Sequence, residues 1–330
     1  MRKVKTALMN SPGLLRTCYR LGLMWPRLRS RAAAALLAAA MLSCSRGEPD
    51  RRCVAASIFP LYDVTRRVAG DRLRVELILP VGRTTHYYDP TPKDVARLAD
   101  ASLVFAVGLG LDSWLAPIVK SAGSGQARIF ELGPLTDPIL APSGGSGKAE
   151  AAQVDPHFWL DPVRMLQVTD LVVEGCRNLD PEGAPGFAAR GGEVKASLRQ
   201  LHAGLMRRSE GWRGRKIVTF HGSLYYFAER YGPEVAAVVE SVPGREPTAR
   251  EIADLVATAR QQKVEALFSE PQLDPRAASV IAGEAGLPVF VIDPIGGSPA
   301  ADSYEKLLGQ IAAALDRALP AVAAGEPVAP

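Results

Sequence analysis

Acidic residues are absent from the first 43 positions of the chain, which carry eight lysines and arginines. An apolar run of about 11 residues, at 32–42, is too short to span a bilayer. A basic stretch, a short apolar run and a small residue are together typical of an export signal. We therefore expect residues 1–43 to be a leader. Residues 1–23 would be an over-called start, since Met24 to Cys44 already makes a complete signal.

Cys44 stands directly after Leu42-Ser43, an order that resembles a lipoprotein cleavage box. This resemblance implies that Cys44 is the acylated residue. The protein would then be exported and lipid-anchored in the cell envelope, in the periplasm or at the outer face of the cytoplasmic membrane. The short polar segment that follows predicts a tether over residues 44–53.

The charge balance gives no support for nucleic-acid binding. The formal net charge of the whole chain is +4, but without the eight basic residues of the leader it becomes −4, so the positive charge belongs to the leader. Apolar residues make up 47% and charged residues 22% of the chain, as in globular proteins. A length of 330 residues suits two domains of ordinary size.

Cysteine is scarce, and two of the four cysteines belong to the leader and its anchor. The other two, Cys53 and Cys176, could pair in an oxidising compartment, or each could be buried singly as a small apolar side chain. The sequence leaves both possibilities open.

Motifs of several enzyme classes are missing. The chain has no His-Glu-x-x-His helix, and Ser223 in His221-Gly222-Ser223 does not form a nucleophile elbow. Gly108-Leu109-Gly110 lacks the third glycine of a dinucleotide fingerprint. We therefore expect a protein that is not an enzyme.

Strand and helix patterns alternate along the chain. We expect strands at 54–59, 73–78, 103–107, 128–131, 216–220, 235–239, 266–269 and 288–292. Helices are expected from 91 and at 62–69, 113–120, 161–179, 188–212, 224–231, 248–261, 274–285 and 302–318. This alternation predicts an α/β fold of parallel sheets flanked by helices.

The predicted elements group into two lobes, each with a parallel sheet of about four strands. We expect an N-terminal α/β lobe at 54–183 and a C-terminal α/β lobe at 213–319. One long, rigid linking helix within 184–212 joins them, and Gly191-Gly192 near its start predicts a frayed or kinked end. The segment 133–153, rich in Pro, Gly and Ser, predicts a mobile surface loop, and residues 320–330 a disordered tail.

Four side chains each follow directly on a predicted strand or on the loop that leaves one: His86, His157, His221 and Asp293. Ligands of open α/β sheets bind outside the carboxyl ends of the strands, and each lobe supplies two of the four. Three imidazoles and one carboxylate complete a four-coordinate shell around a divalent metal, with Zn–N distances of about 2.0–2.1 Å. His202, the remaining histidine, has no acidic or cysteine neighbour at helical spacing, so we expect an ordinary surface or packing residue.

His157 lies between two Asp-Pro pairs, Asp155-Pro156 and Asp161-Pro162. Proline cannot continue a helix interior and pushes the preceding residue to extended geometry, so this turn is stiff and aims the histidine. Asp161 is then a natural N-cap for the next helix. Taken alone, His157 could also be a capping residue packed under a loop.

Longer motifs carry a resemblance to a known family. They are His86-Tyr87-Tyr88-Asp89-Pro90-Thr91-Pro92-Lys93-Asp94, Leu98-Ala99-Asp100-Ala101, Gly108-Leu109-Gly110-Leu111-Asp112-Ser113-Trp114-Leu115, Asp155-Pro156-His157-Phe158-Trp159-Leu160-Asp161-Pro162, Thr219-Phe220-His221, Tyr226-Phe227-Ala228-Glu229-Arg230-Tyr231-Gly232, Phe268-Ser269-Glu270-Pro271-Gln272 and Ile292-Asp293-Pro294. In these motifs the chain resembles the solute-binding proteins of zinc and manganese ABC transporters, the cluster A-I or TroA-like proteins. The resemblance implies two lobes joined by a rigid helix, with the same four residues as metal ligands.

The resemblance also implies a function. Such a receptor captures a divalent cation, zinc first and manganese next, and delivers it to an ABC permease with its cytoplasmic ATPase; we expect a monomer. His221 favours zinc, because manganese binders often have Glu there. Asp89 stands where the family usually has Glu. The predicted loop at 133–153 lacks the histidines of many zinc-specific members, which weakens a zinc-only assignment.

Glu270 is our candidate for fixing an imidazole tautomer, although it could merely cap a turn. Neutral imidazoles bind metal, so we expect affinity to fall as the pH drops through about 6. Release would come from small lobe shifts rather than wide closure.

Three other functions compete with this interpretation. They are a secreted zinc-dependent hydrolase, which would keep one coordination position open for water, a surface adhesin on the same scaffold, and a binder of siderophores or cobalamin, which needs no clustered histidines.

Overall fold

The structure is a computed structural model that describes residues 52–123, 127–141, 153–240 and 244–320. The expected leader, the expected lipidation site Cys44 and the tail from 321 lie outside the described residues. The described residues belong to one compact unit, Arg51–Pro330. Within this part of the chain, no helix has both the length and the apolar character needed to cross a membrane.

The first sheet and its helices form what we call the N-terminal lobe. Its strands are β1 (Cys53–Ala56), β2 (Arg74–Leu77), β3 (Ala101–Ala106) and β4 (Arg128–Glu131). They are parallel, in the order β2-β1-β3-β4. Its helices are α2 (Phe59–Ala69), α3 (Pro92–Arg97), α4 (Leu115–Ser121) and α5 (Pro162–Leu179). Cys53, the last residue of the expected tether, is buried and already pairs with both neighbouring strands.

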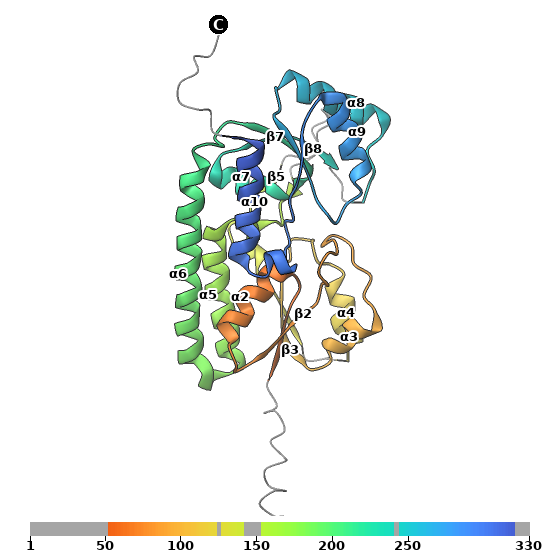
Figure 1. The fold of residues 1–330 in the computed structure, drawn as a ribbon. Helices are drawn as coiled ribbons and strands as arrows, with labels where there is room; N and C mark the ends of the chain where they lie inside the picture. The colour runs from red at the N-terminus through yellow and green to blue at the C-terminus, as the bar shows by residue number, and fades with distance from the viewer. Residues whose placement is uncertain (1–51, 124–126, 142–152, 241–243, 321–330) are drawn as a thin grey trace, which may run out of the picture. The chain divides into compact units, whose positions relative to one another are not determined.

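The C-terminal lobe repeats the pattern with a second parallel sheet. Its strands are β7 (Lys216–His221), β8 (Glu234–Glu240), β9 (Ala266–Ser269) and β10 (Val289–Val291), in the order β10-β9-β7-β8. Its helices are α7 (Tyr225–Tyr231), α8 (Ala249–Gln261), α9 (Pro275–Ala285) and α10 (Tyr304–Ala318). The expected α/β fold with two four-stranded parallel sheets is confirmed (Figure 1).

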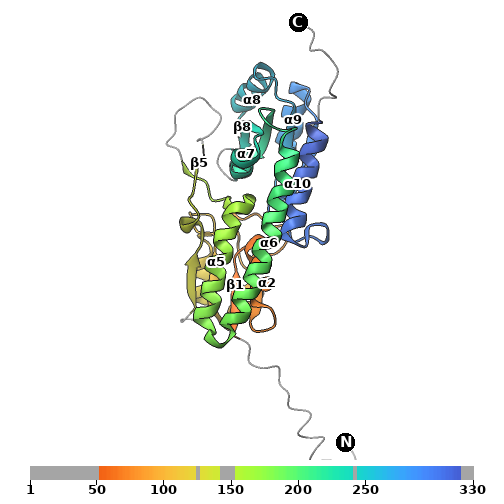
Figure 2. The same cartoon turned by 90° about the vertical axis from the view of Figure 1, so that its left-hand side faces the viewer.

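Helix α6 (Ala184–Ser209) links the lobes. Its 26 residues span about 39 Å, and it packs against α2 and α5 of one lobe and against α7 and α10 of the other (Figure 2). The frayed or kinked end expected at Gly191-Gly192 is not observed, because α6 begins at Ala184 and runs unbroken through both glycines. A Cβ at Gly191 would lie 2.4 Å from Cγ2 of Val173 on α5, so glycine serves close packing of the two helices there.

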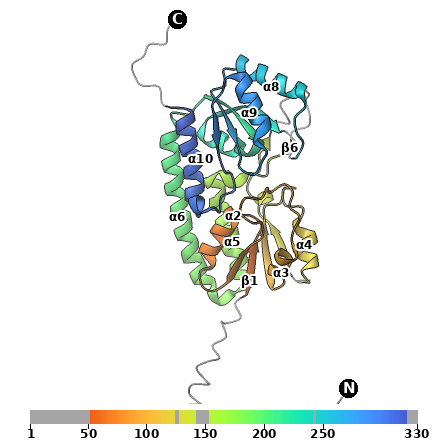
Figure 3. The same cartoon turned by 45° about the vertical axis from the view of Figure 1, so that its right-hand side comes forward.

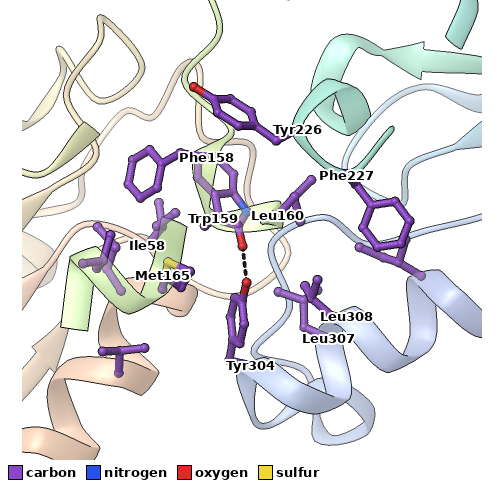
Figure 4. Close-up of a cluster of buried hydrophobic side chains, with 14 of the residues drawn as sticks. Ile58, Phe158, Trp159, Leu160, Met165, Tyr226, Phe227, Tyr304, Leu307 and Leu308 are labelled. Atoms are coloured by element: carbon purple, nitrogen blue, oxygen red, sulfur yellow. Dashed lines mark hydrogen bonds between the residues drawn. The ribbon is translucent and has the colours of Figure 1, made fainter. Parts of the chain in front are cut away.

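One hydrophobic core runs through both lobes. It joins residues of α2 and α5 to residues of α6, α7 and α10. At its centre Trp159 and Tyr304 are fully buried, and the Tyr304 hydroxyl donates a hydrogen bond of 2.6 Å to the Trp159 carbonyl (Figure 4). In Figure 3, α3 and α4 lie beside the first sheet and α8 and α9 beside the second. Smaller hydrophobic clusters lie between each sheet and its two helices. The lobes are therefore stiffly joined by packing as well as by α6.

The segment 133–153 differs from the expectation, and the state of the two cysteines, which the sequence left open, is decided. The segment expected to lack structure contains a short antiparallel pair, β5 (Leu140–Ala141) with β6 (Gln153–Val154), while residues 142–152 lie outside the described residues. Cys53 and Cys176 are both buried and free, so the alternative of single burial holds.

Candidate metal centre

Three of the four expected ligands come from the end of a strand or from a segment that follows a strand. His221 is the last residue of β7, which lies between β8 and β9, where the strand order reverses. His86 lies in the loop between β2 and α3, and His157 follows β6 and caps a 3₁₀ turn, Phe158–Leu160. Crevices outside such strand ends are the usual ligand sites of open α/β sheets.

The loop of His86 is fixed on both sides. The Trp114 indole N–H donates a 2.9 Å hydrogen bond to the carbonyl of Thr85. Beyond His86, the Tyr88 hydroxyl donates to Asp94, which with Thr91 forms the capping box of α3. The position of His86 is therefore fixed by the contacts of its neighbours in the chain.

The three imidazoles converge. Nε2 of His86 lies 2.8 Å from Nε2 of His221, and Nε2 of His221 lies 3.3 Å from Nε2 of His157. Among the described residues, these three histidines form the cluster that could hold a metal ion. Their ligand nitrogens all lie within 4.8 Å of one another. Nitrogens that are about 2.0–2.1 Å from a shared cation would lie about this far apart.

The cavity between these side chains has room for one small ion or one water molecule. His157 and His221 are 4% and 8% exposed, and His86 is half-buried. The cavity has a volume of about 10 Å³, enough for one water-sized sphere. Its lining comes from both lobes: Thr84, Thr85, His86, His157, Trp159, His221, Ser223, Glu240, Glu270, Gln272, Leu273, Pro294 and Ile295.

Burial keeps two of the imidazoles neutral. Desolvation, and then the neighbouring His157, lower the pKa of His86 to about 3. Desolvation also holds the pKa of His221 well below its ordinary value, helped by His157 and His86 and opposed by a backbone hydrogen bond to Glu240. Neutral imidazoles are the form that binds a metal.

A carboxylate orients His157. Oδ1 of Asp155 lies 2.6 Å from Nδ1 of His157 and also accepts a 2.9 Å hydrogen bond from the backbone N–H of His157. A carboxylate only accepts, so Nδ1 carries the proton and Nε2 presents its lone pair to the other histidines. In the sequence, Asp155 stands out only as part of the Asp-Pro-His motif. Its spacing, two residues before the histidine across a proline, was the available signal.

Asp293 is beside this group but not in it. Its Oδ1 accepts hydrogen bonds from Gln272 Nε2 and from the backbone N–H groups of Ile295 and Gly296. Gln272 and Ile295 both line the cavity. Asp293 as a fourth ligand stays a prediction.

Glu270 lines the cavity, but its hydrogen bond comes from the Ser223 hydroxyl, at 2.7 Å. Burial raises its pKa to about 7. Glu240, at the end of β8, lines the cavity as well, and burial raises its pKa too. Glu270 as the group that fixes a tautomer stays a prediction, and Asp155 makes that contact with His157.

His202 lies away from the three histidines. Its Nδ1 is 3.0 Å from the Tyr231 hydroxyl, on the face that α6 turns toward α7. The interpretation of His202 as a packing residue agrees with this contact.

Two α/β lobes around three converging imidazoles define a two-lobed binding protein with a candidate site for a transition-metal cation. The chain belongs to the family described as zinc-uptake complex component A, periplasmic, because the family model matches residues 54–318.

Relatives and solved structures agree with this assignment. The chain is 28% identical over 264 residues to the metal ABC transporter substrate-binding lipoprotein FimA of Streptococcus parasanguinis, covering 76% of this chain and 83% of that one. It is 26% identical over 301 residues to the high-affinity zinc uptake system protein ZnuA of Bacillus subtilis (strain 168), with coverages of 87% and 93%. A crystal structure of ZnuA superposes with a TM-score of 0.72 at 26% identity, covering 82% of this chain and 99% of that chain.

Proposed function

We propose that this chain is the extracytoplasmic receptor of an ABC importer, and that it carries one divalent transition-metal ion, zinc in preference to manganese. One observation carries the proposal. In a member of a zinc-uptake family, the Nε2 atoms of three histidines from two lobes converge on a cavity the size of one water molecule.

The ligands in this proposal are His86, His157 and His221, with Asp293 as the fourth. Three nitrogens and one oxygen make the four-coordinate shell that zinc favours. A site of this composition also accepts other first-row metals, and geometry selects among them. The low pKa values of His86 and His221 support it, because little work is needed to deprotonate them. They move the expected loss of affinity below the pH of about 6 that ordinary imidazoles give.

Release would follow a small separation of the lobes. His86 and His157 belong to one lobe, and His221 and Asp293 belong to the other. A movement of the lobes by less than the length of a coordination bond therefore separates the two pairs of metal ligands. The shared core and α6 oppose a wide hinge motion. This supports release by a small displacement, made when the receptor docks on its permease.

The proposal extends to the surroundings of the receptor. The partners are an ABC permease and its cytoplasmic ATPase, and the protein acts as a monomer without enzymatic activity. The relative from Streptococcus parasanguinis is named a lipoprotein, and this supports export and lipid attachment at Cys44. The domain division proposed is a lobe at 54–183, a linking helix at 184–212 and a lobe at 213–319.

The experiment is a titration of the purified, metal-stripped protein with zinc, in which isothermal calorimetry measures the heat of binding. We expect one zinc ion per chain, and we expect His157→Ala to weaken binding by more than about 100-fold while the circular dichroism spectrum stays unchanged. His202→Ala is the matched control, because it removes a histidine outside the site. Retained stoichiometric zinc of unchanged affinity in His157→Ala would overturn the proposal.

A further inference from the structure

Gln272 and Asp293 leave neighbouring strands at the same edge of the second sheet. Gln272 comes three residues after the end of β9, and Asp293 comes two residues after the end of β10. The two strands are paired in parallel. The side chains therefore meet beside the cavity, where Nε2 of Gln272 lies 2.7 Å from Oδ1 of Asp293.

The two oxygens of Asp293 have different surroundings. Oδ1 accepts three hydrogen bonds, from Gln272 at 2.7 Å, from the backbone N–H of Ile295 at 3.0 Å and from that of Gly296 at 3.1 Å. Oδ2 accepts none from the described residues. A carboxylate oxygen has two lone pairs, so three donors more than fill Oδ1, and Oδ2 is the oxygen left with free lone pairs. Gln272 makes the shortest of the three bonds to Oδ1 and is the side-chain donor among them.

The orientation of the Gln272 amide is dictated by this carboxylate. An amide can offer Asp293 either its NH₂ group or its oxygen, and only the NH₂ group is attracted to a carboxylate. In this orientation Oε1 of Gln272 is buried without a hydrogen-bond partner among the described residues. An unpaired buried acceptor is costly, so the donation to Asp293 outweighs that loss.

We propose that Gln272 is a specificity-determining residue that limits Asp293 to one metal-binding oxygen. With Oδ1 held by Gln272 and the backbone, the carboxylate can donate only Oδ2 to the cation. Together with three imidazoles this makes four donor atoms. The inference rests on the proposed function, and it names the residue that biases the site toward zinc.

The chemistry of the two candidate metals makes the difference measurable. Zinc is stable with four ligands in a tetrahedral arrangement. Manganese prefers more ligands, and oxygen donors in particular. A carboxylate that could use both oxygens would add a fifth donor, which favours manganese relative to zinc. Gln272, as the shortest donor to Oδ1, opposes this together with the two backbone N–H groups.

The test uses Gln272→Met, which is similar in length but has no N–H donor, with Gln272→Leu as a second variant if the first does not fold. Gln310→Met is the matched control, because it removes an exposed glutamine on α10 whose amide donates to the Ala300 carbonyl, outside the site. Affinities for zinc and for manganese are measured for each protein by competition with a chelator. X-ray absorption at the zinc edge counts the donor atoms.

We expect four light donors around zinc in the unchanged protein. In Gln272→Met we expect a fifth donor and a preference for zinc over manganese that is lower by about tenfold or more. Gln310→Met should match the unchanged protein. An unchanged preference and donor count in both Gln272 variants, with zinc still weakened by Asp293→Ala, overturns this inference alone. If Asp293→Ala leaves zinc affinity unchanged, Asp293 is not a ligand, and the inference falls with that part of the proposed function.

Discussion

Oδ1 of Asp155 lies 2.6 Å from Nδ1 of His157, and both side chains are buried. The same oxygen accepts the backbone N–H of His157, so the carboxylate holds both the ring and the main chain of the residue. Asp155 is itself held, since the Tyr226 hydroxyl donates to its carbonyl at 2.8 Å. The imidazole is thus aimed at the centre before any cation arrives, which reduces the ordering cost of binding.

Asp155→Ala removes this support without removing a ligand. We expect zinc affinity to fall by about 10–100-fold while one zinc ion still binds, because such outer partners set the tautomer and the ring orientation. Calorimetric titration measures the change. Asp254→Ala, an exposed carboxylate on α8, serves as the control. An affinity for zinc equal to that of the unchanged protein would show that Asp155 does not orient His157.

The metal-free protein should lose stability in acid through its two depressed histidines. The pKa of His86 is about 3 and that of His221 is well below 6.5 in the folded state. Unfolding therefore takes up protons below about pH 6.5, and the free energy of unfolding falls as the pH decreases from there toward 3. Thermal unfolding with a chelator, at about pH 7.5 and about pH 5, measures the loss.

The variant His86→Gln/His221→Gln isolates these groups from the rest of the chain, including Glu270, whose raised pKa acts in the opposite direction. Its midpoint should drop less between the two pH values than that of the unchanged protein. An equal drop in both proteins would contradict the account of the two pKa values.

Glu270→Gln should stabilise the metal-free protein at alkaline pH. Burial raises the pKa of Glu270 to about 7 from an ordinary value of 4.5, so its ionisation destabilises the fold as the pH rises through 7. Glutamine keeps an oxygen to accept the Ser223 hydroxyl. We expect a gain on the order of 3 kcal/mol near pH 8 and none near pH 4.5, as measured by denaturant unfolding. A pH-independent difference would show that the carboxyl group is not the cause.

Tyr304→Phe should weaken the core that joins the lobes. The hydroxyl donates to the Trp159 carbonyl at 2.6 Å in a fully buried position, and its removal leaves that carbonyl unpaired at a cost of about 1–3 kcal/mol. Zinc stoichiometry should remain one. The control is Tyr62→Phe, since the Tyr62 hydroxyl makes no hydrogen bond with the described residues. Equal unfolding midpoints for the two variants would show that the hydrogen bond from Tyr304 to Trp159 does not stabilise the core.

The arrangement of strands and helices could be predicted because its signals are local. Thr91 with Asp94 and Thr248 with Glu251 form the capping boxes that their spacing indicates. Asp161 caps α5 as the Asp-Pro pair suggests. His221 at the end of β7 and His86 in the loop after β2 could be expected at a ligand site, because ligands bind outside the carboxyl ends of parallel strands. His157 follows β6 of the short antiparallel pair, so this rule does not explain its place.

Other features depend on distances of less than a few ångströms, which a sequence pattern does not contain. Gly191 reads as a weak point in a helix, yet it is the place where α6 lies against Val173. Which carboxylate orients which imidazole depends on side-chain reach, so the sequence pattern does not distinguish Asp155 from Glu270 in this role. Gln272 carries no signal of its own, since its partner lies 21 residues further along the chain, in the segment after another strand.

Anomalous diffraction at the zinc absorption edge, from crystals of the zinc-loaded protein, tests the central claim most directly. The account predicts a single strong peak about 2.0–2.1 Å from the Nε2 atoms of His86, His157 and His221. A peak bound elsewhere on the chain, with these three nitrogens not coordinated to it, would contradict the account.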